Sequence, residues 1–162
     1  MHIEPVSDTS KIKAIEEIAY EIWYEHYTPI IGKNQVEYML EKFQSVKAMT
    51  EEIQNGFLYF LCEYDNKTIG YMSVNISDGV LFLSKLYVLS AERGKGHGRK
   101  MISYLGTLAK EKSLNKISLT VNKHNTGSIN MYKKVGFIIC GTAVKDIGNG
   151  FVMDDYQMEK SV

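Results

Sequence analysis

The chain has 162 residues, of which 44% are hydrophobic, 11% aromatic and 23% charged. This composition is typical of a globular protein, and a chain of this length buries roughly two-thirds of its unfolded surface without disulfides or metals. It excludes disordered, collagen-like and disulfide-scaffold proteins, and we expect a single domain over residues 1–162. Lys plus Arg and Asp plus Glu both total 19, so the formal net charge is zero and no overall field favours nucleic acids or membranes.

The cysteines and the N-terminus bear on where the protein works. Cys62 and Cys140 each lie in an apolar run, which predicts buried thiols in a reducing compartment rather than a disulfide. Residues 1–8 lack the basic and apolar regions of a signal peptide, and the longest apolar run, 57–62, has six residues, which is too short to span a bilayer. We therefore expect a cytoplasmic protein without membrane contact.

The first third of the chain is predicted to be mainly helical. A short strand near residues 3–6 precedes polar capping residues at 7–10. The apolar residues that follow recur at helical spacing, namely Ile12, Ile15, Ile18, Ala19 and Ile22. The segment from Pro29 to Gly32 predicts a break. Helical spacing returns at 36–43 and 46–53, which indicates two further helical pieces.

The rest of the chain alternates strands with helices. Aromatic and β-branched runs predict antiparallel strands joined by turns at Asp65-Asn66 and Asp78-Gly79. The predicted elements are strands at 57–64, 68–76, 80–88, 116–121, 137–144 and 151–159, and helices at 96–112 and 126–135. This order favours an α/β (α+β) fold with a mixed central β-sheet, antiparallel in its N-terminal part and flanked by about four helices.

The most informative segment is 86–100, where a predicted strand runs into a glycine-rich loop that opens a helix. Glycines let backbone N–H groups point into one concavity, and a helix N-terminus adds partial positive charge. Four basic residues reinforce the positive charge locally, namely Arg93, Lys95, Arg99 and Lys100. The pattern predicts a site for a phosphate-type anion. The alternative is a glycine-rich surface turn with a solvated basic face.

The spacing of the loop narrows the ligand. A Walker loop needs Ser or Thr after Gly-Lys, and here Gly94-Lys95 is followed by Gly96. A dinucleotide fingerprint starting at Gly94 would need Gly or Ala near position 99, which is Arg99. Nucleotide hydrolysis and dinucleotide binding are therefore both disfavoured.

Two motifs resemble the Gcn5-related N-acetyltransferase (GNAT) superfamily. Arg93-x-x-Gly96-x-Gly98, after the strand Leu86-Tyr87-Val88, is similar to the family's acetyl-CoA signature. About thirty residues later, Val121 to Asn125 and then Ser128-Ile129-x-x-Tyr132-Lys133-x-x-Gly136-Phe137 resemble its second motif. The resemblance implies a GNAT-like fold, acetyl-CoA as co-substrate, and transfer of the acetyl group directly to a primary amine.

The resemblance also implies roles for particular residues. The pyrophosphate of CoA would be held by backbone N–H groups of the loop, namely Arg93, Gly94, Lys95, Gly96, His97 and Gly98. Leu86 and Val88 would pair their main chain with the pantetheine arm, and the Val88 N–H would polarise the thioester carbonyl. Asn125 would bind the CoA arm. Tyr132 would face the sulfur and act as the acid for the leaving thiolate.

Each of these side chains has a purely structural alternative, and the base is missing. Tyr132 could pack in the core with a satisfied hydroxyl. Asn125 could cap the helix that starts at residue 126. His97 is expected to be an exposed loop residue. Many family members place a carboxylate on the strand where Leu83-Ser84-Lys85 offers none, so we assign no base. The remaining choices are a water chain or a side chain acting through water, namely Glu25, His26, Asp154 or Asp155.

The amine acceptor is expected near residues 23–29. This aromatic segment would line the acceptor side in the family, with Trp23, Glu25 and Tyr27 as candidate substrate-binding residues, or it simply closes the core. Together with residues 154–160 it looks similar to bacterial polyamine acetylators, which favours a small amine such as a polyamine. The alternatives are acetylation of a protein N-terminus or lysine, and a non-catalytic acetyl-CoA sensor.

Other partners are expected to be few. The four histidines show no ligand spacing with cysteines or carboxylates, so we expect no metal. Nucleic-acid binding is disfavoured by the balanced charge and by the lack of a reading helix. An exposed strand edge in the C-terminal half could pair two copies into a homodimer.

Overall fold

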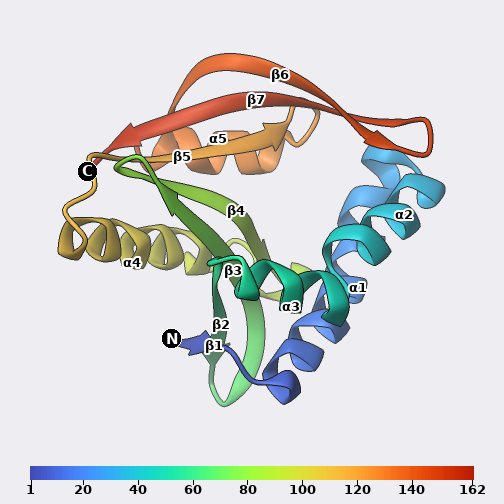
Figure 1. The fold of residues 1–162 in the computed structure, drawn as a ribbon, viewed down its shortest axis with the longest axis horizontal. Coiled ribbons are helices and arrows are strands. Elements are labelled where there is room, and N and C mark those ends of the chain that lie inside the picture. Colours follow the sequence, from blue (N-terminus) through green and yellow to red (C-terminus); the bar gives the residue numbers. More distant parts are fainter. The chain divides into compact units, whose positions relative to one another are not determined.

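The computed structural model describes residues 1–162 (Figure 1). Its seven strands follow the sheet order β1-β2-β3-β4-β5-β7-β6. The strands are β1 (His2–Val6), β2 (Leu58–Tyr64), β3 (Lys67–Ser77), β4 (Val80–Val88), β5 (Lys116–Asn122), β6 (Ile138–Gly148) and β7 (Phe151–Ser161). The helices are α1 (Thr9–Ile31), α2 (Lys33–Phe43), α3 (Val46–Gln54), the 3-10 turn η1 (Ser90–Glu92), α4 (His97–Glu111) and α5 (Thr126–Lys134). The predicted mixed sheet is confirmed, with five α-helices rather than about four.

Backbone contacts divide the chain into two units. The first contains Met1–Asn75 with Lys85–Gly98, and the second contains Ile76–Ser84 with Arg99–Val162. In the first unit β1, β2 and β3 pair antiparallel. The turn between β2 and β3 places Asp65 and Asn66 at φ 53° and 58°, the left-handed pair that a tight hairpin requires. The hairpin predicted at these residues is confirmed.

Helix α1 begins at a side-chain cap and ends at a glycine. The Asp8 carboxylate accepts the N–H of Lys11 and caps the helix. The apolar residues predicted at helical spacing are all buried on its inner face. The break predicted at 29–32 is placed too early, because the helix continues through Pro29 to Ile31 and ends at Gly32 with φ 84°. A proline removes one backbone donor, and here it does so in the last turn of the helix.

In the second unit, parallel and antiparallel pairings occur side by side. The first half of β4 pairs parallel with β5, from Val80 opposite Lys116 to Leu83 opposite Leu119. β5 then pairs antiparallel with β7, and β7 with β6. Strands β4 and β5 are connected through α4, the crossover that a parallel pair needs. The expected change from antiparallel pairing to crossovers is therefore confirmed.

The end of the sheet corrects one prediction about the cysteines. Cys62 on β2 is buried, but Cys140 on β6 is exposed. Strand β6 is last in the sheet order and has a neighbouring strand on one side only. Ile138, on the same strand as Cys140, is 64% exposed. The apolar run around Cys140 predicts a buried thiol, and this prediction is wrong because the run lies on an edge strand. Separately, no helix combines the length and apolar character needed to cross a lipid bilayer.

Candidate functional site

The site begins where β4 ends. Burial alternates along β4 up to Lys85, and then Leu86 and Tyr87 are both half-buried before Val88 is buried again. Next to this irregularity β3 approaches closely, since a Cβ on Gly70 would lie 2.3 Å from the Tyr87 carbonyl oxygen. The backbone N–H of Leu89 donates to the carbonyl of Ile69 at 2.9 Å. The segment around Val88 is thus held at a fixed distance from β3.

The glycine-rich loop follows directly. Gly94 and Gly96 have φ 76° and 84°, and a Cβ on either would meet nothing within 4 Å. These glycines are therefore required by the backbone conformation and not by lack of space. Left-handed residues in such a loop turn neighbouring N–H groups into a common concavity, and α4 begins at His97 with its positive dipole end. The loop has the backbone conformation expected of the predicted anion site, and its binding of a pyrophosphate stays a prediction.

The charged side chains of the loop are engaged within the first unit. The Arg93 Nε donates to the Val88 carbonyl oxygen at 3.0 Å, and its Nη1 lies 3.1 Å from the His26 Nδ1. The Lys95 Nζ lies 3.0 Å from the Glu92 Oε1, and this hydrogen bond is the main reason that the pKa of Glu92 is lowered. Both cations therefore have partners within the protein.

His97 corrects a further prediction. It was expected to be an exposed loop residue, but it is 4% exposed. Its ring lies 4.8 Å from that of Tyr64, and its Nε2 lies 3.4 Å from the Glu92 Oε2. As the first residue of α4, His97 packs its side chain against Tyr64 at the end of β2. This buried contact anchors the end of the glycine-rich loop.

The candidate acceptor residues at the end of α1 lie beside β4. Trp23 stacks on Tyr27 at 4.4 Å between ring centroids, and Trp23 also contacts Tyr87 at 5.6 Å. Trp23 is 3% exposed and belongs to the core, whereas Tyr27 is half-buried and Glu25 is exposed. The Glu25 carboxylate accepts from the Ser90 hydroxyl at 2.7 Å. Of these three residues, Tyr27 and Glu25 have surface that a substrate can reach.

Asn125 and Tyr132 belong to the second unit. The Asn125 side chain accepts the N–H of Ser128 at 3.4 Å and caps α5, so the capping role weighed in the sequence is present. Tyr132 is buried and packs against the edge of Phe137 at 5.5 Å between centroids. Both residues have structural roles, and their roles toward CoA stay predictions.

Among the candidate bases, Asp155 on β7 stands out. It is buried, and desolvation raises the pKa of its carboxyl, with a further contribution from the charge of Asp154. Asp154 itself lies 2.5 Å from the Lys123 Nζ. No group of three or more His, Cys, Asp and Glu side chains is placed to hold a metal ion.

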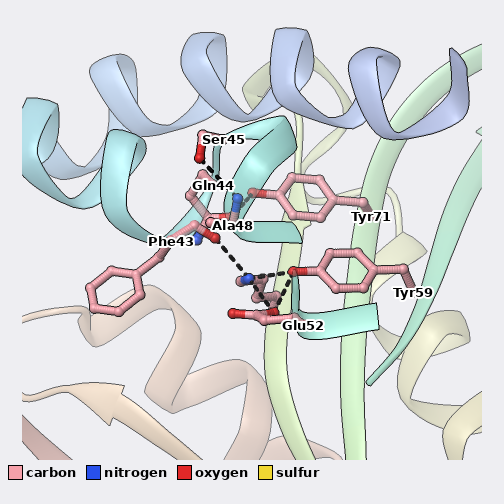
Figure 2. A network of polar contacts seen from close by, with 8 residues as sticks. Phe43, Gln44, Ser45, Ala48, Glu52, Tyr59 and Tyr71 are labelled. Atoms are coloured by element: carbon pink, nitrogen blue, oxygen red, sulfur yellow. Dashed lines mark hydrogen bonds and ion pairs between the residues drawn. The ribbon is translucent and has the colours of Figure 1, made fainter. Parts of the chain in front are cut away.

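A buried polar cluster in the first unit has no counterpart among the residues predicted from the sequence. Lys85 lies on the face of β4 that also buries Leu81 and Leu83, and its ammonium contacts Glu52 and Tyr59 (Figure 2). A charged residue in register with two buried leucines is the signal that could have revealed it.

The mixed sheet and the strand–glycine loop–helix segment agree with the GNAT-like fold that the two motifs imply. The sequence model of the Acetyltransferase (GNAT) family matches residues 13–137. The chain belongs to this family, which confirms the predicted superfamily.

Similar proteins agree with this class. The chain is 26% identical over 117 residues to the uncharacterized N-acetyltransferase YobR of Bacillus subtilis, which covers 72% of this chain and 45% of that protein. The chain thus spans about half the length of this relative. The PaiA N-acetyltransferase of Thermoplasma acidophilum, solved in complex with coenzyme A, has the same fold, with a TM-score of 0.82 at 22% identity over 100% of both chains. Ribosomal-protein-alanine N-acetyltransferase of Brucella melitensis gives a TM-score of 0.73 at 22% identity, again over 100% of both chains.

Proposed function

We propose that the protein transfers the acetyl group of acetyl-CoA to a primary amine, by direct attack of the amine on the thioester. A C–N bond forms, the C–S bond breaks, and CoA leaves as the thiol. The observation that carries the proposal is the loop at 93–98, whose left-handed Gly94 and Gly96 follow a strand that ends at Val88. The family match runs through both units of the chain, which supports one domain over residues 1–162.

The main chain does most of the binding in this proposal. Backbone N–H groups of residues 93–98 hold the pyrophosphate, including those of Lys95, His97 and Gly98. Leu86 and Val88 pair with the pantetheine arm, and Asn125 hydrogen-bonds it. The Val88 N–H stabilises the oxygen that gains negative charge during attack, which is the usual task of an oxyanion donor.

Two proton transfers must accompany the reaction. An amine of pKa about 10.4 is neutral in only ~1 molecule in 2500 at pH 7, so its proton has to be removed by a base or a water chain. The CoA thiolate needs a proton as it leaves, and we assign this role to Tyr132. Tyr132→Phe should lower kcat by about 100-fold while CoA binding is retained. An unchanged kcat would rule out the assigned role.

The acceptor we propose is a small cationic amine such as a polyamine. Support comes from the end of α1, where Glu25 supplies an exposed carboxylate and Tyr27 a half-buried ring beside Tyr87. Aromatic faces and carboxylates both attract ammonium groups. The balanced charge and free thiols agree with a cytoplasmic enzyme.

Two other functions have specific support. The shared fold with the Brucella ribosomal-protein-alanine enzyme favours an N-terminal amine of a protein as acceptor. The absence of a carboxylate at Leu83-Ser84-Lys85 favours an acetyl-CoA sensor without turnover.

One assay separates these functions. Release of CoA thiol from acetyl-CoA at pH 8 is measured with spermidine, spermine, aminoglycosides, amino acids, lysine peptides and peptides with a free N-terminal alanine, and CoA binding is measured by calorimetry in parallel. Release with polyamines supports the proposal, and release with peptides only supports the protein acceptor. Binding without release supports the sensor, and absence of binding overturns the assignment of the loop.

A homodimer is the assembly we propose. Support comes from the edge strand β6, where Ile138 and Val144 are exposed on a strand with one neighbour. Light scattering should give twice the 18.4 kDa chain mass. Val144→Lys should shift the mass to that of the monomer.

A further inference from the structure

The proposed function makes strand β4 the element that needs accurate placement. An oxyanion donor acts only within hydrogen-bond distance of the developing charge, and an error of about 1 Å can cost about 100-fold in rate. Val88 is the last residue of β4. Whatever fixes the last four residues of β4 therefore bears on catalysis.

Lys85 occupies that position and is unusual for a strand core. It lies three residues before Val88 and is 4% exposed. Burial lowers the pKa of Lys85, and the carboxylate of Glu52 acts in the opposite direction. Burying an ammonium is unfavourable unless each of its donors has a partner.

Each partner of Lys85 comes from a different element. Its Nζ donates to the carbonyl oxygen of Phe43, the last residue of α2, at 2.9 Å. It lies 2.8 Å from the Oε2 of Glu52 on α3, and it also bonds the hydroxyl of Tyr59 on β2. Figure 2 shows Phe43, Glu52 and Tyr59 converging on this one nitrogen. An ammonium has three N–H groups, and here each has an acceptor.

The partners also hold one another. The Tyr59 hydroxyl donates to the same Glu52 oxygen at 2.6 Å. Burial, with the charge of Glu52, raises the pKa of Tyr59 far above its ordinary value, so the hydroxyl stays a donor. Lys85, Glu52 and Tyr59 are thus each hydrogen-bonded to the other two, so rotation of any one side chain breaks two hydrogen bonds.

A second contact ties the same helix end to β4. Gln44 follows Phe43, is buried, and accepts from the Tyr71 hydroxyl at 3.0 Å. Tyr71 in turn contacts the ring of Tyr87 at 5.1 Å between centroids, and Tyr87 precedes Val88. The end of α2 thus contacts β4 through Lys85 and, by way of Tyr71, through the ring of Tyr87, the residue before Val88.

Stability alone does not account for such a cluster. A buried ion pair is often no more stabilising than apolar side chains of the same volume, because desolvation offsets the attraction. What hydrogen bonds add is direction, since they fix the distance and angle of every partner. The cluster therefore specifies where β4 lies relative to α2, α3 and β2.

We propose that Lys85 is a positioning residue for the acetyl transfer: its ammonium, held by Phe43, Glu52 and Tyr59, fixes β4 so that the Val88 N–H meets the thioester oxygen. The inference rests on the proposed function. It makes Lys85 neither a base nor a contact of the substrate.

The test separates position from stability. Lys85→Met leaves the half-buried Glu52 without its cation. It should lower both the free energy of unfolding and kcat, the latter by about 10- to 100-fold, with the dissociation constant of CoA unchanged. The triple variant Lys85→Met/Glu52→Met/Tyr59→Phe removes the charges and hydroxyl together, and should regain stability. Under the proposal its kcat stays low. A kcat that recovers along with stability overturns the proposal and makes the cluster purely structural.

Lys116→Met is the matched control. Lys116 also forms a 2.8 Å ion pair, with Glu159, but both side chains are more than a third exposed. The same charge is lost, and kcat should equal that of the wild type. A fall in kcat as large as that of Lys85→Met would overturn the positioning role.

A second readout does not need turnover. In protein labelled with ¹⁵N-valine, the Val88 amide signal should move when acetyl-CoA is added to the wild type and to Lys116→Met, and should move by a clearly smaller amount in Lys85→Met. A wild-type signal that ignores acetyl-CoA overturns the proposed function and this inference with it. A full shift in Lys85→Met overturns the positioning role alone.

Discussion

The guanidinium of Arg93 donates from Nε to the carbonyl oxygen of Val88 at 3.0 Å. The first residue of the anion-binding loop thereby holds the last residue of β4. The same guanidinium reaches His26 on α1, and because it can only donate, the His26 Nδ1 accepts. The side chain of Arg93 thus links the loop to β4 through Val88 and to α1 through His26. A change in the loop is therefore expected to alter both the proposed cofactor site and the candidate acceptor residues next to His26.

Arg93→Leu should therefore weaken binding of CoA. A hydrogen bond to a charged group contributes about 1.5–3 kcal/mol, so its loss at the loop should raise the dissociation constant by about tenfold or more. Calorimetry with CoA measures this. Lys110→Ala, an exposed substitution in the last turn of α4, is the control and should bind as the wild type does. Equal affinities of all three proteins would show that Arg93 does not organise the loop.

Gly96→Ala and Gly106→Ala should change stability in opposite directions. Neither Cβ would meet an atom within 4 Å, so only the backbone differs. Gly96 has φ 84°, where an alanine costs about 1–2 kcal/mol. Gly106 lies inside α4, where alanine is favoured by about 0.5–1 kcal/mol. Urea unfolding should give a lower free energy for the first and a higher one for the second, and only the first should weaken CoA binding. Two changes of the same sign would contradict this account.

The two thiols should differ in reactivity. Burial raises the pKa of Cys62 to about 12, so at pH 8 only about one thiol in 10,000 is ionised. Cys140 is exposed. A disulfide reagent should thus label one thiol in the native protein and two after unfolding in urea. Cys140→Ser should abolish the native reaction, and rapid labelling of that variant would show that Cys62 is accessible.

Asp155→Asn should stabilise the protein at pH 7 but not in acid. The pKa of Asp155 is raised by burial, so the folded chain binds more protons than the unfolded chain. The contribution of Asp155 to the free energy of unfolding then falls as pH rises from the ordinary Asp pKa, about 3.9, through the raised pKa of the folded state. Above that pH the contribution stays lower. In urea unfolding, the increase in the free energy of unfolding caused by Asp155→Asn should be larger at pH 7 than at pH 4. Glu111→Gln, at the exposed end of α4, should behave alike at both values, and a gain from Asp155→Asn that does not grow would refute the assignment.

Local patterns were enough to predict most of the elements and the glycine-rich turn between β4 and α4. The strand predicted at 80–88 is Val80–Val88, and the helix predicted at 96–112 is His97–Glu111. Side-chain alternation, helical spacing and the left-handed preference of glycine act over a few residues, so neighbouring residues report them. The first motif indicates the family for the same reason, because its glycines lie at a fixed spacing within six residues.

Burial at particular positions could not be predicted in the same way. Trp23 could line an acceptor site or close the core, and its contact with Tyr87 decided for the core. His97 looked exposed beside its glycines and is buried against Tyr64. Cys140 looked buried in an apolar run and is exposed on the edge strand. Each outcome depends on which distant element lies alongside, and this information is absent from the neighbouring sequence.

The sequence by itself determined the order of elements, the glycine loop that can hold a phosphate, and membership of the acetyltransferase family. Only the tertiary structure decided that Lys85 is buried and that Phe43, Glu52 and Tyr59 surround its ammonium. These residues are separated by up to 42 positions along the chain, and each alone reads as an ordinary lysine, glutamate or tyrosine. A buried charge acquires its partners only when the chain has folded, because its desolvation must be offset by groups that no local pattern brings together.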